Sequence, residues 1–198
     1  MNWTYTIGPG YYYGHKDLSA GAPQNAENIK NYLTNISGDT YTPESIIGII
    51  ANADHESYMN PGQQEHGKGG SSAYGYGLFQ WTPASSKIVA YANNVGGNWY
   101  DGDIQLDYAF DLGHNVENTW VMNEPYTFAQ YRLITDIYLA TKVFFRNFER
   151  GTWHNVMNEY AYYWYDTLYG SQPPTPPTPT IDPKMVILMK NKRGEELY

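Results

Sequence analysis

The chain has 198 residues, enough for one domain with a substantial core, and 41% of them are hydrophobic. Its net charge is −8, from 12 Lys and Arg against 20 Asp and Glu, which argues against the basic face of a nucleic-acid-binding protein. The absence of cysteine excludes disulfides and thiolate metal sites, and no apolar run approaches the roughly 20 residues of a membrane span. We therefore expect no nucleic-acid partner and no stable membrane insertion.

The chain is rich in aromatic residues, with 21 Tyr, 6 Trp and 6 Phe. Tyrosine combines an apolar ring with a polar tip, so it suits wet binding grooves and ligands such as sugars. A tyrosine-rich core and surface without a ligand is the alternative interpretation of this composition.

The first part of the chain predicts an arm followed by two helices. Residues 1–24 show no periodicity and no signal-peptide pattern, so they predict an arm. One helix is expected from Asn25 to about Gly38. The next begins at Thr42-Pro43-Glu44, because threonine can cap a helix, proline fits its first position and glutamate favours the positive end of its dipole. This second helix is apolar and is expected to end at Asn60-Pro61-Gly62.

The second part predicts a loop and then further helices. Residues 62–77 are rich in Gly and Ser and predict a loop, with a short helix after Thr82-Pro83. Helices are also expected at 103–116, 127–148 and 153–169. The 127–148 helix rests on an apolar stripe of Leu133, Ile137, Ala140, Phe144 and Phe148. Because strand signals are weak, the core domain, 25–170, is predicted to be mainly α.

The C-terminal part predicts a linker and a short tail. Residues 171–183 contain a run of prolines that is typical of a semi-rigid polyproline spacer. Residues 184–198 are too few to fold alone. A docking strand, an oligomer contact, a weak membrane-surface contact and the remnant of a longer parent chain remain open for them.

Glu56 is the candidate catalytic residue. It lies near the end of the apolar helix, seven residues after Ile49 and three after Ala53, on an apolar face. Burial and the negative end of the helix dipole both disfavour the ionised carboxylate, so we expect the raised pKa that a general acid needs. An exposed glutamate at a frayed helix end is the alternative. Asp54 is expected to point to a different face.

The sequence predicts no metal and no cofactor. His55, beside Glu56, suggests the helix of a zinc protease, but that motif needs a second histidine four residues later, where this chain has Met59. His66 is not at helical spacing from His55.

The segment Gly75-Tyr76-Gly77-Leu78-Phe79-Gln80-Trp81 predicts the close-packed wall of a groove. It lacks the preceding strand and the Lys-Ser/Thr of a phosphate loop. Tyr76, Gln80 and Trp81 are its candidate substrate-binding or water-positioning residues, because they offer ring faces and an amide with both donors and an acceptor. A core tryptophan is the alternative for Trp81.

Glu149 is the second carboxylate that we expect near the site, in a substrate-binding or water-positioning role. It follows a run of Phe at the end of the predicted 127–148 helix. A helix-end ion pair with Arg146 or Arg150 is the alternative.

Together these motifs resemble the phage tail lysozymes, the lysozyme domains of tail-tip proteins of short-tailed phages. A more distant resemblance is to goose-type lysozymes and lytic transglycosylases. The resemblance spans about 25–170 and rests on Asn25-Ala26, Ile29, Tyr32-Leu33, Thr42, Ile47-Gly48-Ile49, Glu56-Ser57, Asn60-Pro61 and Gly77-Leu78-Phe79-Gln80-Trp81-Thr82-Pro83, and more weakly on Phe148-Glu149-Arg150 and Ala161-Tyr162-Tyr163-Trp164-Tyr165. The family usually has proline after Arg150, where this chain has Gly151-Thr152.

The resemblance implies a lysozyme-like helical domain with a loop-rich cleft, with Glu56 as its catalytic acid and Gln80 in the cleft. It implies a muramidase that cleaves the β-1,4 bond between N-acetylmuramic acid and N-acetylglucosamine in peptidoglycan. The expected place is the phage tail, with other tail proteins as partners, acting on the host wall from outside. A secreted or holin-released lysis enzyme is the other possibility for that place.

The sequence also favours one reaction course over its rivals. With one acid candidate and no nucleophile candidate, we expect inversion, with the attacking water held by Gln80 or other polar groups. A lytic transglycosylase that uses the same Glu56 and a non-catalytic glycan-binding tail module remain open alternatives.

Overall fold

The computed structural model describes residues 1–9, 21–110 and 119–170, and confirms a mainly α-helical fold. The elements are β1 (Gly8–Pro9), α1 (Ala22–Asn35), α2 (Pro43–Ser57), β2 (Gln63–Gln64), η2 (Ala84–Ser86), α3 (Ile88–Asn94), α4 (Gly102–Phe110), α6 (Phe128–Tyr131), α7 (Ile137–Phe144), η3 (Phe145–Glu149) and α8 (Val156–Tyr169). Within the described ranges, strands occur only as the parallel pair of β1 and β2. The predicted linker and tail, 171–198, lie outside these ranges.

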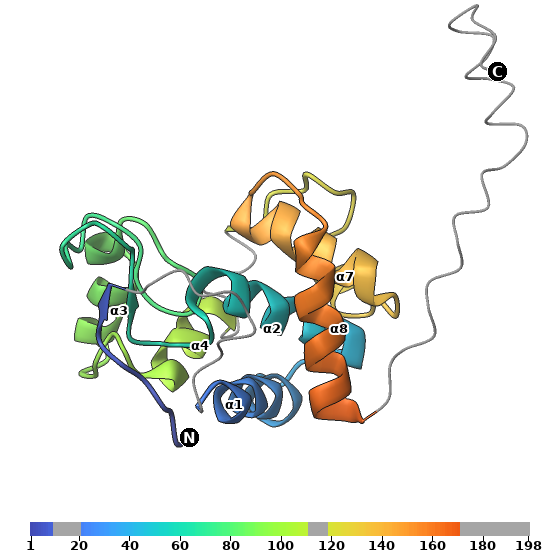
Figure 1. Ribbon diagram of the computed structural model, residues 1–198, viewed down its shortest axis with the longest axis horizontal. Helices are drawn as coiled ribbons and strands as arrows, with labels where there is room; N and C mark the ends of the chain where they lie inside the picture. Colours follow the sequence, from blue (N-terminus) through green and yellow to red (C-terminus); the bar gives the residue numbers. More distant parts are fainter. Residues whose placement is uncertain (10–20, 111–118, 171–198) are drawn as a thin grey trace, which may run out of the picture.

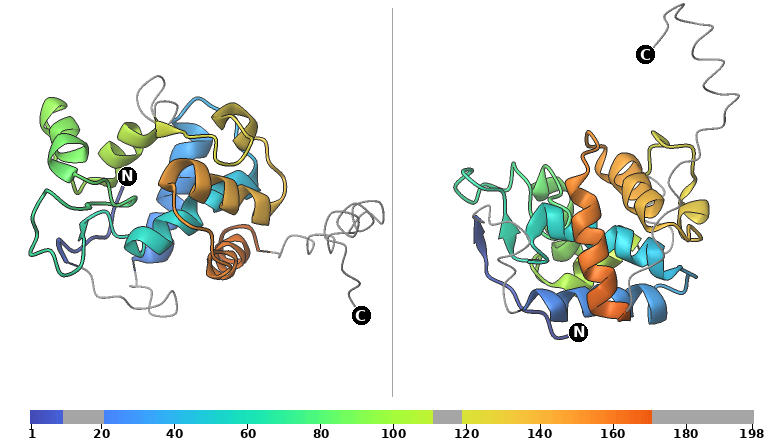
Figure 2. Two further views of the ribbon diagram at one scale, coloured as in Figure 1. Left: turned by 90° about the horizontal axis from the view of Figure 1, so that it is seen from above. Right: turned by 45° about the vertical axis from the view of Figure 1, so that its right-hand side comes forward.

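Helix α2 is the central element of the fold. It packs mainly against α7 and α8, and α1 covers a further side, as the views in Figures 1 and 2 also show. Most residues of α2 are buried, including the run of isoleucines near its start. Its N-terminus is capped as predicted, because the Thr42 side chain accepts a hydrogen bond from the Ser45 backbone amide at 3.2 Å.

The prediction of one helix over 127–148 is wrong. The structure divides this range into α6, a non-helical connection, and α7 continued by the π-helical turn η3. The carbonyl of Arg132 accepts hydrogen bonds from two residues at the start of α2, so it does not continue the helical ladder. Asp136 then caps the new helix by accepting from the Leu139 amide at 2.8 Å. Leu133 consequently lies off the apolar stripe and is 61% exposed.

Other predicted boundaries differ by smaller amounts. Helix α1 starts at Ala22 and helix α2 ends at Ser57, each a few residues earlier than predicted. Helix α8 starts at Val156, three residues later than predicted. The predicted 103–116 helix is observed as α4 up to Phe110, and its remainder falls outside the described residues. The loop over 62–77 contains the short strand β2.

The described helices include none that is long and apolar enough to cross a membrane. The domain boundaries at 25–170 remain a prediction.

Candidate active site

Glu56 lies in the last turn of α2, beside the point where the helix ends in an unusual way. Tyr58 and Met59 both have left-handed backbone conformations, with φ of 53° and 61°. Two consecutive non-glycine residues in this region are rare and require support from their surroundings. The turn therefore ends α2 sharply and directs the chain away, leaving the half-buried Glu56 at the edge of the helical core.

Burial raises the pKa of Glu56 to about 7. The carboxylate loses hydration in this position, so the protonated form is favoured. The sequence predicts the same upward shift of this pKa. At neutral pH a substantial fraction of Glu56 is thus available to donate a proton.

Glu149 belongs to the same electrostatic cluster as Glu56. Its pKa is raised well above the ordinary value, first by burial and then by the charge of Glu56. Its Oε1 atom is buried and has no hydrogen-bond partner among the described residues. The positive charges of Arg150 and Lys87 act on Glu149 in the opposite direction. The structure therefore brings together two carboxyl groups and two cations, from α2, η3 and the start of α3.

The π-helical turn η3 places Glu149 at this position. Asn147, in the middle of the turn, is fully buried and its side chain bonds the backbone of Glu124 at 2.7 and 3.0 Å. Arg146, one alternative partner of Glu149, instead donates to the Gly151 carbonyl at 2.6 Å. A Cβ on Gly151 would lie 2.3 Å from the Phe145 ring, so packing requires glycine after Arg150.

The neighbours of Glu56 on α2 face other surroundings. Asp54 is buried, and its Oδ2 accepts a hydrogen bond from the indole of Trp164 on α8 at 2.9 Å, on a different face as predicted. The ring of His55 lies 5.0 Å from that of His154, and burial lowers its pKa to about 4. The described residues contain no cluster of three or more side chains suited to a metal ion.

The segment 75–81 forms a tight, self-bonded turn. Gln80 has a left-handed backbone (φ 45°), and its Nε2 donates to the Gly77 carbonyl at 2.9 Å. A Cβ on Gly75 would lie 3.0 Å from the backbone carbonyl oxygen of Gln80, so this close approach of the backbone favours glycine. None of the described contacts joins Gln80 to Glu56, and its place in a substrate site remains a prediction.

The two aromatic candidates of this segment are packed inside the protein. Tyr76 is 5% exposed, its ring lies 4.5 Å from that of Trp99, and its hydroxyl donates to the Gly70 carbonyl. Trp81 is 8% exposed and packs edge-on against Phe79. Both rings therefore have a structural role in the wall, and little of either remains free to stack on a sugar.

Two residues of this region are absent from the sequence prediction. Lys87 joins the charged cluster, and no motif marks it. Gln105 is fully buried: its Oε1 accepts from the Leu78 amide at 2.8 Å and its Nε2 donates to the Pro61 carbonyl at 2.7 Å. Gln105 thus connects the segment after Glu56 with the 75–81 segment, a role that spacing alone does not reveal.

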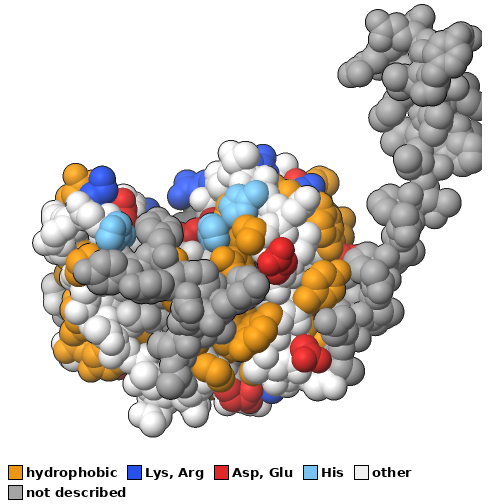
Figure 3. Space-filling view, in the orientation of Figure 1, with side chains coloured by type: hydrophobic (Ala, Val, Ile, Leu, Met, Phe, Trp, Pro, Cys, Tyr) orange, Lys and Arg blue, Asp and Glu red, His pale blue; other side chains and the backbone are white. Residues whose placement is uncertain are grey.

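The surface is notched between the side that carries α3 and the side that carries α7 and α8 (Figure 3). Acidic, basic and histidine side chains are visible around this notch.

Comparison with known proteins gives the family. Over 150 residues the chain is 30% identical to Morphogenesis protein 1 of Bacillus phage B103. That alignment covers 74% of this chain and 40% of the relative, so the chain spans less than half of the relative's length. The phage tail lysozyme model matches residues 24–168, a range that includes Glu56, Gln80 and Glu149. The chain therefore belongs to the phage tail lysozyme family.

Proposed function

We propose that this protein is a muramidase that cleaves the β-1,4 bond between N-acetylmuramic acid and N-acetylglucosamine in peptidoglycan, with Glu56 as general acid. The observation that carries the proposal is the pairing of Glu56, whose pKa is raised to about 7, with a second buried carboxyl group, Glu149. Two carboxyl groups with different proton affinities are the usual equipment for hydrolysing a glycosidic bond.

The two carboxyl groups titrate as a pair, because the charge of one disfavours ionisation of the other. The reactive form holds one proton between them. Burial has the largest effect on Glu149 and raises its pKa, whereas Lys87 and Arg150 lower it, so the two cations increase the share of the pair that has the proton on Glu56 and the charge on Glu149. The proposed reaction uses this arrangement, with Glu56 as the acid and Glu149 as the base.

In the proposed reaction Glu56 gives its proton to the glycosidic oxygen as the bond from that oxygen to the anomeric carbon breaks. A water molecule attacks the anomeric carbon, and ionised Glu149 accepts the proton that this water loses. The carboxyl pair thus gives one proton to the leaving sugar oxygen and takes one from the attacking water. The configuration at the anomeric carbon inverts. Gln80 stays a candidate for holding the water through its Oε1, since its Nε2 is bonded to Gly77.

The biological setting follows from the family. Membership of the phage tail lysozymes suggests a virion component that acts on peptidoglycan, and the name of the B103 relative refers to phage morphogenesis. We propose that the protein is carried in the phage tail and opens the host wall locally at infection, next to other tail proteins.

The test is product analysis of purified peptidoglycan after digestion. The proposal predicts fragments with new reducing N-acetylmuramic acid ends by mass spectrometry, and an inverted anomer in the first minutes by NMR. Fragments lighter by one water would identify a lytic transglycosylase instead. Binding to the wall without any new ends would leave a non-catalytic glycan-binding module.

A further inference from the structure

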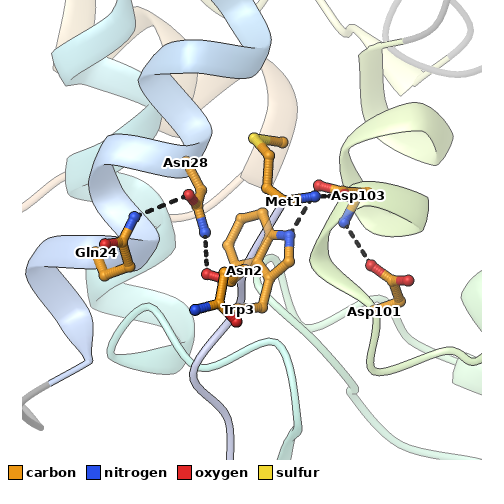
Figure 4. A network of polar contacts seen from close by, with 7 residues as sticks. All are labelled: Met1, Asn2, Trp3, Gln24, Asn28, Asp101 and Asp103. Carbon is orange, nitrogen blue, oxygen red and sulfur yellow. Dashed lines mark hydrogen bonds and ion pairs between the residues drawn. The ribbon is translucent and has the colours of Figure 1, made fainter.

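The first nine residues, here called the N-terminal arm, pack along the domain although they precede the family match at 24–168. Trp3 lies between α1 and α4 (Figure 4), and its indole donates to Asp103 Oδ1 at 2.8 Å. The Trp3 ring covers Gly102, where a Cβ would come within 2.2 Å of it. The amino group of Met1 also pairs with the carboxylate of Asp103. The start of the arm is therefore held against α4 by specific contacts.

Two asparagine side chains receive the arm in the way that a neighbouring strand would. The Asn25 amide accepts from the Thr4 N–H at 3.0 Å and donates to the Thr4 carbonyl at 2.6 Å. The Asn60 amide does the same for Thr6, at 3.1 and 2.8 Å. Both asparagines stand in the motifs that mark the resemblance, and the proposed reaction gives neither of them a role.

Asn25 connects the arm to the turn that follows Glu56. It is 1% exposed, and its Nδ2 also donates to the Met59 carbonyl at 2.8 Å. Met59 is one of the two left-handed residues at the end of α2. Since this conformation needs outside support, one buried amide holds both the arm and the helix end that carries Glu56.

The arm also reaches the 75–81 segment, through β2. Gly8 pairs with Gln63 in parallel register, and a Cβ on Gly62 would lie 2.7 Å from the Thr6 carbonyl oxygen. On its other edge, the Gln63 carbonyl accepts from the Gly77 amide at 2.8 Å. Strand β2 is therefore held between the arm and the segment that contains Gln80.

We propose that the N-terminal arm is a strap that positions the active site, with Asn25 and Asn60 as its positioning residues. It fixes both the turn after Glu56 and, through β2, the 75–81 segment. Release of the arm loosens these two segments and leaves the helical core of α2, α7 and α8 in place. The consequence for catalysis rests on the muramidase function proposed above.

The test compares Trp3→Ala with Ile7→Ser in the full chain. Trp3 anchors the arm on Gly102 and Asp103 of α4, whereas Ile7 lies on the same arm and is 49% exposed. Hydrogen exchange of the amides in 57–64, 75–81 and α8 is followed by mass spectrometry, together with kcat and KM on a wall that the wild type cleaves. Trp3→Phe keeps a ring over Gly102 and loses the donor to Asp103, so it replaces Trp3→Ala if that variant does not fold.

If the arm acts as a strap, Trp3→Ala exchanges its amides faster than the wild type in 57–64 and 75–81 and at the same rate in α8. Its kcat is lower by roughly tenfold, because small displacements of a reacting group slow catalysis strongly. Ile7→Ser should match the wild type in all of these. The proposal would be overturned if Trp3→Ala exchanged its amides at the rate of Ile7→Ser, or if it exchanged them faster with an unchanged kcat. A wild type that cleaves no wall would instead refute the muramidase function, while the exchange comparison still decides whether the arm positions the two segments.

Discussion

At the scale of single residues, the proposed reaction depends on which of two carboxyl groups holds a proton. Burial disfavours the ionised forms of Glu56 and Glu149, and the charge of one acts on the other, so ionising the two together costs much free energy. Lys87 and Arg150 act against the burial of Glu149 by lowering its pKa, and they thereby increase the share of the form with the proton on Glu56. The cations are thus part of the acid–base equipment even though neither has to touch the bond that breaks.

Lys87→Gln should shift the acid limb of the pH–activity profile upward by roughly half a unit. Removal of the cation raises the pKa of Glu149, so its ionised form appears only at a higher pH. The measurement is kcat/KM against pH, with Lys30→Gln as control. Lys30 pairs with Glu27 on α1, and its replacement changes the net charge by the same amount. Equal profiles for the two variants would show that Lys87 does not act on the pair.

The raised pKa of Glu56 can be predicted from the sequence, whereas the surroundings of its carboxyl group cannot, for a physical reason. The burial of Glu56 follows from the period of its own helix. Lys87 and Gln105 gain their roles only when distant segments meet, so no local pattern marks them. Glu149 is expected near the site although the helix predicted to carry it is interrupted, because η3 still continues α7 to that residue.

At the scale of elements, the close approach of α2 and α7 sets the position of Glu56. Gly48 is the contact point, since a Cβ there would lie 2.9 Å from the backbone carbonyl carbon of Ala140 and 2.8 Å from the Tyr131 hydroxyl. A backbone cannot move aside as a flexible side chain can. The glycine is therefore explained by packing between helices and not by conformational freedom.

Gly48→Ala should destabilise the protein by about 1–2 kcal/mol, because the overpacking cost exceeds the gain of about 1 kcal/mol in helix propensity. Urea unfolding followed by circular dichroism measures this change. A stability equal to or above that of the wild type would mean that α2 and α7 can separate freely at this point.

The interrupted 127–148 range shows what periodicity cannot reveal about elements. Four of the five stripe residues are buried as predicted, so the period is correct on both the helix and its continuation. The interruption comes from hydrogen bonds between the Arg132 carbonyl and the start of α2, which is distant in sequence. Capping by Asp136 is the one local signal that could have revealed it.

At the scale of the whole molecule, stability should depend on pH because several carboxyl groups are buried. Burial raises the pKa of Asp54 and that of Glu56 to about 7, and it raises the pKa of Glu149 well above its ordinary value. The folded chain keeps these protons where the unfolded chain has lost them, so stability falls as pH rises from about 4 through 7. His55, with a pKa lowered to about 4, opposes this trend below pH 6.5, as one group against three.

Calorimetry should therefore find a lower Tm at pH 8 than at pH 5. Asp54→Asn removes one of these groups and keeps an acceptor for Trp164. The Tm of this variant relative to the wild type should accordingly rise between pH 5 and pH 8. A difference that stays constant over this range would contradict the raised pKa of Asp54.

The role of Glu56 as the acid of a muramidase can be tested directly. The most direct measurement is the rate at which soluble fragments leave a purified wall for Glu56→Gln, with Asp54→Asn as the matched control on the opposite face of α2. If Glu56 is the general acid, Glu56→Gln lowers the rate by roughly 10²-fold or more, while Asp54→Asn stays close to the wild type. Release by Glu56→Gln at the rate of the wild type would contradict this role.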